Sequence, residues 1–397
     1  MTVCVPKGFL VAGVHCRIKD DPQKLDLTLI MSETEATAAG VYTQNEVHGA
    51  PVALNRQRTP SDRIRAVVIN SGVANACTGQ RGLEDARTMA RQAAQACGAE
   101  EEQALVMSTG VIGAFLPMDK IEQGVMSAAV KLGSSEPCLV SAARGMMTTD
   151  TVHKLAGRTV EIGGREIQIT GMAKGAAMIG PNMATMLAVV MTDAALEPTV
   201  AQTLLKGAVD ESFNCISVEG HMSTSDTVLL LASGAAGGEP LADDDLATFR
   251  AAFEEVCVEL ARAIPADGEG ATHLISIEVD GCTDRAAAAQ IAKTVANSAL
   301  VKTAVAGADP NWGRIVSAAG YADVAFDPTR VDLKINGHLL YESGAPVEFD
   351  DAAVSDSIRN NRDTLVQLRF GDGDATARFW TTDLTAEYVR LNADYRT

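Results

Sequence analysis

Short apolar runs alternate, along the first two thirds of the chain, with stretches in which apolar residues recur every three or four positions. One such run, IRAVVIN (64–70), is followed after a glycine-bearing loop by an amphipathic stretch at 82–98. ALVMS (104–108) and TVLLLASG (227–234) are further runs of the same kind. Buried strands separated by amphipathic helices are typical of α/β proteins, so the pattern predicts an α/β fold here.

The clearest helical pattern lies at 243–263. Apolar residues recur there at intervals of three and four positions: Leu246, Phe249, Phe253, Val256 and Leu260. This spacing places them on one face of a helix. Because proline cannot donate a backbone hydrogen bond, we expect the helix to end before Pro265.

The pattern changes from about residue 274. LISIEVDG (274–281) alternates like a half-buried strand, and a helix is predicted at 284–304. Asn336-Gly337 predicts a hairpin within 331–344, and GDGD predicts a second hairpin within 365–380. We therefore expect a catalytic core at 1–280 and a smaller α+β lobe at 281–397.

The composition of the chain limits the classes of partner and substrate that we expect. The chain has 397 residues, more than one hydrophobic core usually holds, and its 47% of hydrophobic residues includes few aromatics, which suits layered helix-on-sheet packing. Its 33 basic and 51 acidic residues give a net charge of −18, which disfavours nucleic acid or an anionic membrane as partner. We therefore expect small substrates.

Eight cysteines occur without a CxxC motif or a histidine cluster, so neither a metal site nor a disulfide framework is expected, and the thiols are interpreted as buried. The six histidines form no catalytic pairing in the sequence. No signal peptide and no apolar run of membrane-spanning length is present. A cytoplasmic enzyme is the resulting expectation.

The segment KGAAMIGPNMATML (174–187) carries the strongest chemical signal. Pro181 and Asn182 disfavour a helix, and TMLAVVMTDA (185–194) resembles a buried strand. If the Ala184–Thr185 bond is cut, the free α-amine of Thr185 can act as base for its own hydroxyl. The alternative is that Thr185 begins an ordinary core strand.

Two further segments suit such a nucleophile. Ser108-Thr109-Gly110 pairs a hydroxyl with a glycine, whose backbone can approach an oxyanion closely, although a simple strand-ending turn has the same pattern. Lys174 can bind a substrate carboxylate or lie on a solvated surface.

In DGEGATH (267–273), Glu269 stands between two glycines and can receive an ammonium group. A calcium loop is the competing interpretation, but the regular spacing of oxygen ligands is absent. The C-terminal NADYRT carries Asn392 and Thr397, and a chain end of this kind frays unless it docks.

Together these segments resemble the ornithine acetyltransferase family, also called glutamate N-acetyltransferase, and the resemblance runs from the N-terminus to Thr397. The matching stretches are NSGVANACTG (70–79), STGVIG (108–113), MTTDT (147–151), KGAAMIGPNMATML (174–187), STSDTVLLLASG (223–234), DGEGATH (267–273), KTAVAGADPNWGR (302–314) and NADYRT (392–397).

The resemblance implies an N-terminal-nucleophile-like autoprocessing fold with an αββα-like core. It also implies self-cleavage between Ala184 and Thr185 into an α chain (1–184) and a β chain (185–397). Thr185 then carries acetyl from N-acetyl-L-ornithine to L-glutamate in a ping-pong cycle, while Thr109 and Gly110 bind the oxyanion. The implied substrate-binding residues are Thr148, Lys174, Thr185, Glu269, Asn392 and Thr397.

An amide-to-ester-to-amide exchange keeps the acetyl group activated, so no cofactor is expected, although acetyl-CoA remains open as a second acetyl donor. No metal is expected either. We expect the C-terminal tail to return to the active site, and an (αβ)₂ or larger oligomer to help exclude water. Val73, Gly180 and EGHMSTSDT (219–227), which contains His221-Met222, depart from the family pattern. The alternatives are an N-terminal-nucleophile amidohydrolase or aminopeptidase, in which water replaces glutamate, and an uncleaved silent paralogue.

Overall fold

The computed structural model describes residues 3–180 and 186–394 of the chain, which divide into two compact units. Within the described residues, unit 1 comprises the chain up to Asn214 together with Met222–Ile264. Unit 2 comprises Cys215–His221 and the chain from Pro265 onward. The sequence places the main boundary at 280, whereas this division falls near the end of a long helix.

Within its described residues, unit 1 is built on eight strands and six α-helices. The strands are β1 (Phe9–Val14), β2 (Leu27–Tyr42), β3 (Ser61–Val73), β4 (Ala104–Val111), β5 (Lys154–Ile162), β6 (Arg165–Lys174), β7 (Leu187–Thr192) and β8 (Thr227–Ala232). The helices are α1 (Ala50–Asn55), α2 (Gly79–Ala96), α3 (Met118–Val130), α4 (Glu136–Gly145), α5 (Pro198–Glu211) and α6 (Asp243–Ala266), with short 3₁₀ turns at Glu101–Gln103 and Phe213–Cys215.

Strand β2 joins two halves of one sheet, whose order is β4-β3-β2-β8-β7-β6-β5, with β1 also paired to β2. The first half of β2 pairs with β1 and β3, starting at Leu27 opposite Asn70, and its second half pairs with β8. Apolar side chains of the two halves share one core, which includes Val67, Val189 and Leu229.

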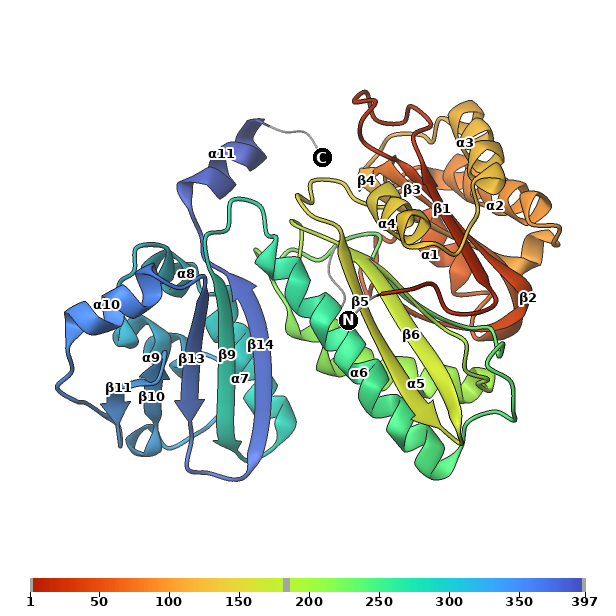
Figure 1. Ribbon diagram of the computed structural model, residues 1–397. Helices are drawn as coiled ribbons and strands as arrows, with labels where there is room; N and C mark the ends of the chain where they lie inside the picture. Colours follow the sequence, from red (N-terminus) through yellow and green to blue (C-terminus); the bar gives the residue numbers. More distant parts are fainter. Residues whose placement is uncertain (1–2, 181–185, 395–397) are drawn as a thin grey trace. The chain divides into compact units, whose positions relative to one another are not determined.

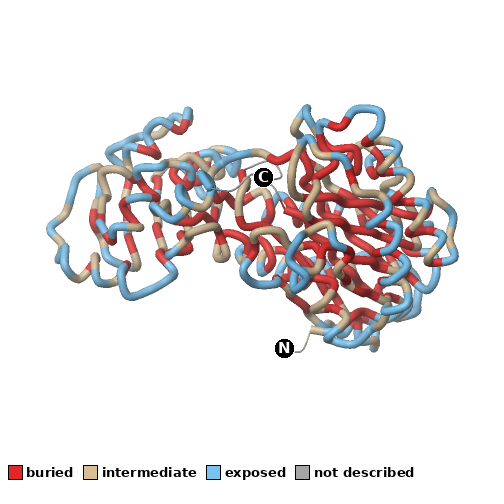
Figure 2. Tube along the Cα trace, turned by 90° about the horizontal axis from the view of Figure 1, so that it is seen from above, coloured by how far each residue is buried: buried red, intermediate tan, exposed pale blue. Residues whose placement is uncertain are grey.

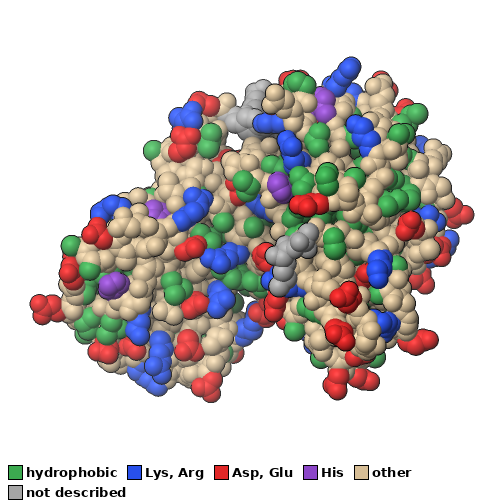
Figure 3. All heavy atoms as spheres, in the orientation of Figure 1, with side chains coloured by type: hydrophobic (Ala, Val, Ile, Leu, Met, Phe, Trp, Pro, Cys, Tyr) green, Lys and Arg blue, Asp and Glu red, His purple; other side chains and the backbone are tan. Residues whose placement is uncertain are grey.

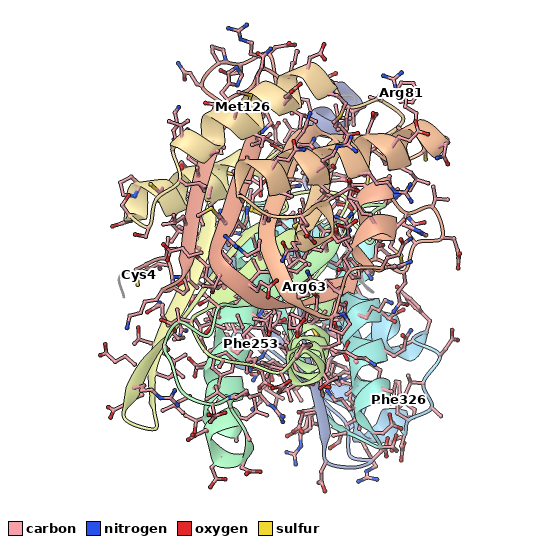
Figure 4. All side chains as sticks on the ribbon, turned by 90° about the vertical axis from the view of Figure 1, so that its right-hand side faces the viewer. Cys4, Arg63, Arg81, Met126, Phe253 and Phe326 are labelled. Atoms are coloured by element: carbon pink, nitrogen blue, oxygen red, sulfur yellow. The ribbon has the colours of Figure 1, made fainter. Side chains whose placement is uncertain are left out.

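The opposite face of β2–β4 packs against α2 and α3, and Val68 and Val106 share a second hydrophobic core with Met89 and Ile121. Figure 1 shows α2 and α3 on one side of unit 1 and α5 and α6 on the other, and Figure 4 faces the α2–α3 side. The unit is therefore a helix–sheet–sheet–helix sandwich, which confirms the layered α/β fold expected from the sequence. Figure 2 shows long buried stretches of the chain in the interior of unit 1.

Helix α6 buries the apolar face that its sequence predicts. Phe249 and Phe253 (the latter labelled in Figure 4) stack with ring centroids 6.0 Å apart, and neither is exposed. The predicted end before Pro265 is wrong, because α6 continues to Ala266. Proline's fixed φ suits a helix, and at this last-turn position its missing N–H forfeits only one hydrogen bond.

Unit 2 contains a six-stranded sheet of order β12-β11-β10-β13-β9-β14 with helices around it. Its strands are β9 (Leu274–Cys282), β10 (Asp332–Ile335), β11 (His338–Glu342), β12 (Ala345–Pro346), β13 (Asp363–Arg369) and β14 (Ala375–Thr382). Its helices are α7 (Arg285–Asn297), α8 (Ala299–Ala306), α9 (Trp312–Gly320), α10 (Asp351–Arg359) and α11 (Ala386–Asp394), with a 3₁₀ turn at Pro328–Arg330.

Two expectations for unit 2 need correction. The hairpin at Asn336-Gly337 is confirmed, but the second predicted hairpin is wrong, because β9 lies between β13 and β14 and pairs with both. The single helix predicted at 284–304 is two helices. Ser298 has an extended backbone, and its side chain accepts a hydrogen bond from the Val301 N–H, so it ends α7 and caps α8.

The cysteines are all free thiols, as expected, but Cys4 and Cys77 are exposed and Cys138 is only partly buried. Within the described ranges 3–180 and 186–394, no helix combines the length and the apolar composition needed to cross a membrane.

Candidate active site

The ends of several unit 1 strands meet at one edge of the sandwich. Strands β3 and β4 run parallel and end together, with Ser71 opposite Thr109 and Gly72 opposite Gly110. Strand β6 ends at Lys174, which pairs with Leu187 at the start of β7. The chain from Lys174 to Leu187 therefore leaves and re-enters the sheet at the edge where β4 ends.

Lys174 and Thr109 are in direct contact at this edge. The Lys174 Nζ donates a hydrogen bond to the Thr109 Oγ1 at 3.3 Å, and both residues are almost fully buried, at 2% and 1% exposure. A solvated surface position for Lys174, the alternative left open by the sequence, is therefore excluded. A buried ammonium needs compensating polar partners nearby.

Asp150 supplies the nearby negative charge. Its Oδ1 accepts hydrogen bonds from the Lys154 Nζ at 2.7 Å and the Gly175 N–H at 2.6 Å, and its Oδ2 accepts one from the Thr148 N–H at 3.0 Å. Burial alone raises the pKa of this carboxyl, but the charges of Lys174 and Lys154, with these hydrogen bonds, lower it to about 2. Asp150 is therefore ionised at neutral pH and holds Thr148 beside the base of Lys174.

Gly110 occupies a position that only glycine can fill. Its φ is +127°, and a Cβ there would lie 2.3 Å from the carbonyl carbon of Gly72, which also has a positive φ. Asn70 braces the same strand ends, because it accepts a hydrogen bond from the Ser108 Oγ at 2.6 Å and donates one to the Val73 carbonyl. The close approach of β3 and β4 at Gly110 follows from these contacts.

A second carboxyl, Asp226, lies at the start of β8. Its Oδ1 accepts a hydrogen bond from the Met186 N–H at 3.1 Å, and Met186 directly follows Thr185 in the chain. Asp226 is fully buried, and its Oδ2 has no hydrogen-bond partner among the described residues. Burial raises its pKa well above the usual range, although the Met186 N–H and the charge of Lys174 oppose that shift.

Replacing Asp226 with asparagine is expected to stabilise the protein at neutral pH. Below the unfolded-state pKa of about 3.9, Asp226 is protonated in both the folded and the unfolded chain, so its raised pKa does not change the free energy of unfolding. Above that pH the carboxyl ionises first in the unfolded chain, so the stability of the parent falls as the pH rises toward the folded-state pKa. The introduced asparagine does not titrate, and it keeps an acceptor for Met186. In urea unfolding between pH 4 and 8, the free energy of unfolding of Asp226→Asn should rise relative to that of the parent. The difference should grow by about 1.4 kcal/mol for each pH unit up to the folded-state pKa.

The matched control for that series is Asp62→Asn, which removes the same charge from an exposed position. We expect its urea midpoint to follow the parent at every pH. An Asp226→Asn chain whose stability parallels the parent across the whole range would contradict the inference that burial raises the pKa of Asp226.

In unit 2, Glu269 and Asn392 lie together. The Asn392 Nδ2 donates a hydrogen bond to the Glu269 Oε2 at 2.9 Å, which joins the 267–273 loop to α11. Gly270, with φ of +68°, is packed so closely against Tyr388 of the same helix that a Cβ would meet its backbone nitrogen at 2.5 Å. The helix that carries Asn392 is therefore docked rather than frayed, through a loop that only glycine can form.

Several predicted residues cannot be located. Ala184, Thr185 and Thr397 lie outside the described residues, as do Pro181 and Asn182. Sequence reasoning missed Asp150, Lys154 and Asp226 as parts of the site, although Asp150 and Asp226 stand within the MTTDT and STSDT segments.

Comparison with known proteins identifies the family of the chain. The model of the ArgJ family matches residues 10–397. The chain belongs to the ArgJ family. A curated relative from Rhodopirellula baltica, named arginine biosynthesis bifunctional protein ArgJ, is 46% identical over 396 residues, which cover 99% of this chain and 96% of the relative. The protein of that name from Geobacter sulfurreducens is 46% identical over 98% of this chain and 99% of its own.

A solved structure supports the ArgJ assignment. The crystal structure of arginine biosynthesis bifunctional protein ArgJ from Bacillus halodurans matches with 37% sequence identity and a TM-score of 0.51. The match covers 52% of this chain and 98% of that chain.

The structure also locates departures of this chain from the ArgJ pattern. The Val73 backbone carbonyl accepts a hydrogen bond from the Asn70 Nδ2 at 2.8 Å, a bond that does not depend on the side chain at position 73. His221 is exposed, and the Met222 carbonyl accepts a hydrogen bond from the Asn45 Nδ2 at 3.3 Å.

Proposed function

We propose that this ArgJ acyltransferase of arginine biosynthesis works through Thr185, which becomes a chain terminus by self-cleavage after Ala184. In this proposal Thr185 takes acetyl from N-acetyl-L-ornithine and passes it to L-glutamate. The observation that carries the proposal is the buried contact between Lys174 and Thr109, because it joins the end of β4 to the base of the segment that holds Thr185.

Self-cleavage would proceed by an N-to-O acyl shift. The Thr185 hydroxyl attacks the Ala184 carbonyl, the Ala184–Thr185 C–N bond breaks, and the hydroxyl proton ends on the new α-amine. Water then hydrolyses the resulting ester, which releases the Ala184 carboxylate and frees the hydroxyl. Holding the attacking and attacked groups together makes this step effectively unimolecular.

Acetyl transfer would use the same hydroxyl. The α-amine of Thr185 removes its proton, the oxygen attacks the acetyl carbonyl, and ornithine leaves with that proton on its amine. The reverse sequence with the amine of glutamate regenerates the free threonine. The two amides and the ester lie within a small range of acyl-transfer potential, so no cofactor is needed, and acetyl-CoA is a further candidate donor.

Thr109 and Gly110 suit the oxyanion that forms in both steps. A hydroxyl has one donor and two acceptor sites. Because the Thr109 Oγ1 accepts its hydrogen bond from Lys174, its own O–H remains available to donate. The Lys174 charge behind it would further stabilise a developing negative charge.

We propose that Thr148, Lys174, Glu269, Asn392 and Thr397 bind the amino-acid substrates. The acetyl ester survives only if water is excluded, so we also propose a closed site in an (αβ)₂ or larger assembly in the cytoplasm. Hydrolysis of N-acetylornithine without glutamate would instead indicate an amidohydrolase.

The test is an intact-mass measurement followed by transfer assays. We expect two polypeptides whose masses sum to that of the 41.5 kDa precursor plus one water, the second of them beginning at Thr185. With N-acetylornithine alone, ornithine should be released in a burst of one equivalent; glutamate should make the release continuous. A stable single chain would overturn the proposal and favour the silent paralogue.

A further inference from the structure

A pocket of about 70 Å³ lies in unit 1 between the β1–β2 loop and the end of α4. Lys19 and Lys24 line it from the loop, and Arg144 lines it from the last turn of the helix. Thr148 and Asp150 complete its polar lining. We call this site the cationic pocket, defined by Lys19, Lys24 and Arg144.

The carboxylate of the cationic pocket does not balance its positive charge. Asp150 already accepts hydrogen bonds from Lys154, Gly175 and Thr148, and the charges of Lys154 and Lys174 offset its own. Asp26, whose charge acts on Lys19, balances one of the three basic side chains, so the pocket keeps an excess of positive charge.

This excess runs against the composition of the chain, whose net charge is −18. In Figure 3, basic side chains gather at the end of unit 1 that carries the β1–β2 loop, while acidic ones predominate around the start of α6. A local concentration of cations in an acidic protein favours an anionic ligand at that place.

Hydrogen bonds fix the loop side of the pocket. Asp26, which is fully buried, accepts hydrogen bonds from the Cys16 N–H at 2.6 Å and the Lys19 N–H at 3.0 Å. The Lys19 Nζ then donates to the Leu25 carbonyl at 2.7 Å and the Met147 carbonyl at 2.6 Å. Lys19 thus ties the loop to the segment after α4, and its ammonium retains a third N–H.

The helix side is fixed as well. The Thr28 Oγ1 donates to the Ala142 carbonyl at 2.6 Å, and the Ser71 Oγ donates to the Gly145 carbonyl at 2.7 Å. These bonds hold the last turn of α4, and with it the backbone of Arg144, against the sheet. Such preorganisation is what a specific subsite requires.

Burial lowers the pKa of Lys19 to about 8, an effect that the charge of Asp26 opposes. The amine is therefore mostly protonated at neutral pH, and an anion placed beside it would favour the charged form further.

We propose that the cationic pocket binds the side-chain carboxylate of the acetyl acceptor. The inference rests on the proposed function, in which one site must release ornithine, with a cationic side chain, and admit glutamate, with an anionic one. A pocket of this charge distinguishes the two. Its volume suits a carboxylate arm and is far below the several hundred Å³ typical of sites for larger ligands such as nucleotides.

The test compares glutamate with its neutral isostere glutamine as acceptor. Arg144→Gln and Lys24→Gln change exposed side chains, and Lys19→Met removes the better buried charge. We expect Arg144→Gln or Lys19→Met to lower kcat/KM for glutamate by about 10- to 100-fold, the usual effect of losing a hydrogen bond to a charged group. Transfer to glutamine and the burst of ornithine release from N-acetylornithine should change by less than about twofold.

Lys131→Gln is the matched control, because Lys131 is an exposed lysine of unit 1 that does not line the pocket. It should leave the glutamate-to-glutamine ratio unchanged. Thermal melting of each variant separates lost folding from lost binding.

Three results would overturn the inference. An unchanged glutamate-to-glutamine ratio in the pocket variants removes the carboxylate assignment while leaving the proposed function intact. A loss confined to acetyl-CoA as donor would show that the bound anion is a phosphate. If the unaltered protein acetylates neither acceptor, the proposed function fails and the inference falls with it.

Discussion

A chain carrying Thr185→Ala is expected to remain a single polypeptide and to lose acetyl transfer by a factor of about 10⁴ to 10⁶. A methyl group cannot attack the Ala184 carbonyl or carry an acetyl ester, so both the processing step and the transfer step lose their nucleophile. Intact-mass analysis reports the first step, and the release of ornithine from N-acetylornithine reports the second.

Thr185→Ser is the matched control, because it retains the hydroxyl at the same position. We expect this chain to split after residue 184 and to transfer acetyl more slowly, since a serine hydroxyl lacks the methyl that restricts its rotation. Cleavage of the Thr185→Ala chain at the same bond, or acetyl transfer close to that of the parent, would contradict the assignment of Thr185 as nucleophile.

The layers of unit 1 could be predicted because each of its strands and helices shows a recognisable local pattern of apolar residues. Strands β7 and β8 are buried at every position, so each appears as a continuous apolar run, and the helix that becomes α6 shows its apolar face at regular intervals. Which strands pair with one another could not be predicted from local patterns. The insertion of β9 between β13 and β14 joins segments about 90 to 110 residues apart, and no local pattern encodes it.

The residues of the candidate site likewise fall into those that the sequence indicates and those that only the fold reveals. Thr109, Gly110 and Lys174 stand in distinctive segments, and the close approach at Gly110 is a backbone property for which glycine is the signal. Asp150 and Asp226 look like ordinary acidic residues in the sequence. Their significance comes from complete or nearly complete burial and from partners next to the ends of β6 and β7, which the fold alone brings close to them.

Gly110→Ala is expected to lower the rate of acetyl transfer by about 10² to 10³, the typical effect of losing one oxyanion donor. The new Cβ would have to occupy space 2.3 Å from the Gly72 carbonyl carbon, in a backbone conformation that alanine rarely adopts. The end of β4 must therefore move away from β3, and the Gly110 N–H moves with it. Single-turnover release of ornithine measures the effect on the first chemical step.

Gly113→Ala separates displacement from strain. Gly113 also has a positive φ, +83°, but nothing lies within 4 Å of where its Cβ would be. Alanine there should cost about 1–2 kcal/mol of stability through backbone strain and leave the transfer rate near that of the parent. Equal rate losses in Gly110→Ala and Gly113→Ala would mean that the strain of the loop, and not the position of the Gly110 N–H, controls the reaction.

Thr109→Val completes the argument, because it keeps the side-chain shape and removes the hydroxyl that lies between Lys174 and the proposed oxyanion. If the Thr109 hydroxyl, polarised by Lys174, donates to the oxyanion, Thr109→Val should slow acetyl transfer about as much as Gly110→Ala does. Unlike Gly110→Ala, this substitution introduces no steric clash that could account for the loss. A Thr109→Val chain that transfers acetyl at the parent's rate would leave Gly110 as the sole oxyanion donor and would assign the Lys174 contact to the structure of the strand edge.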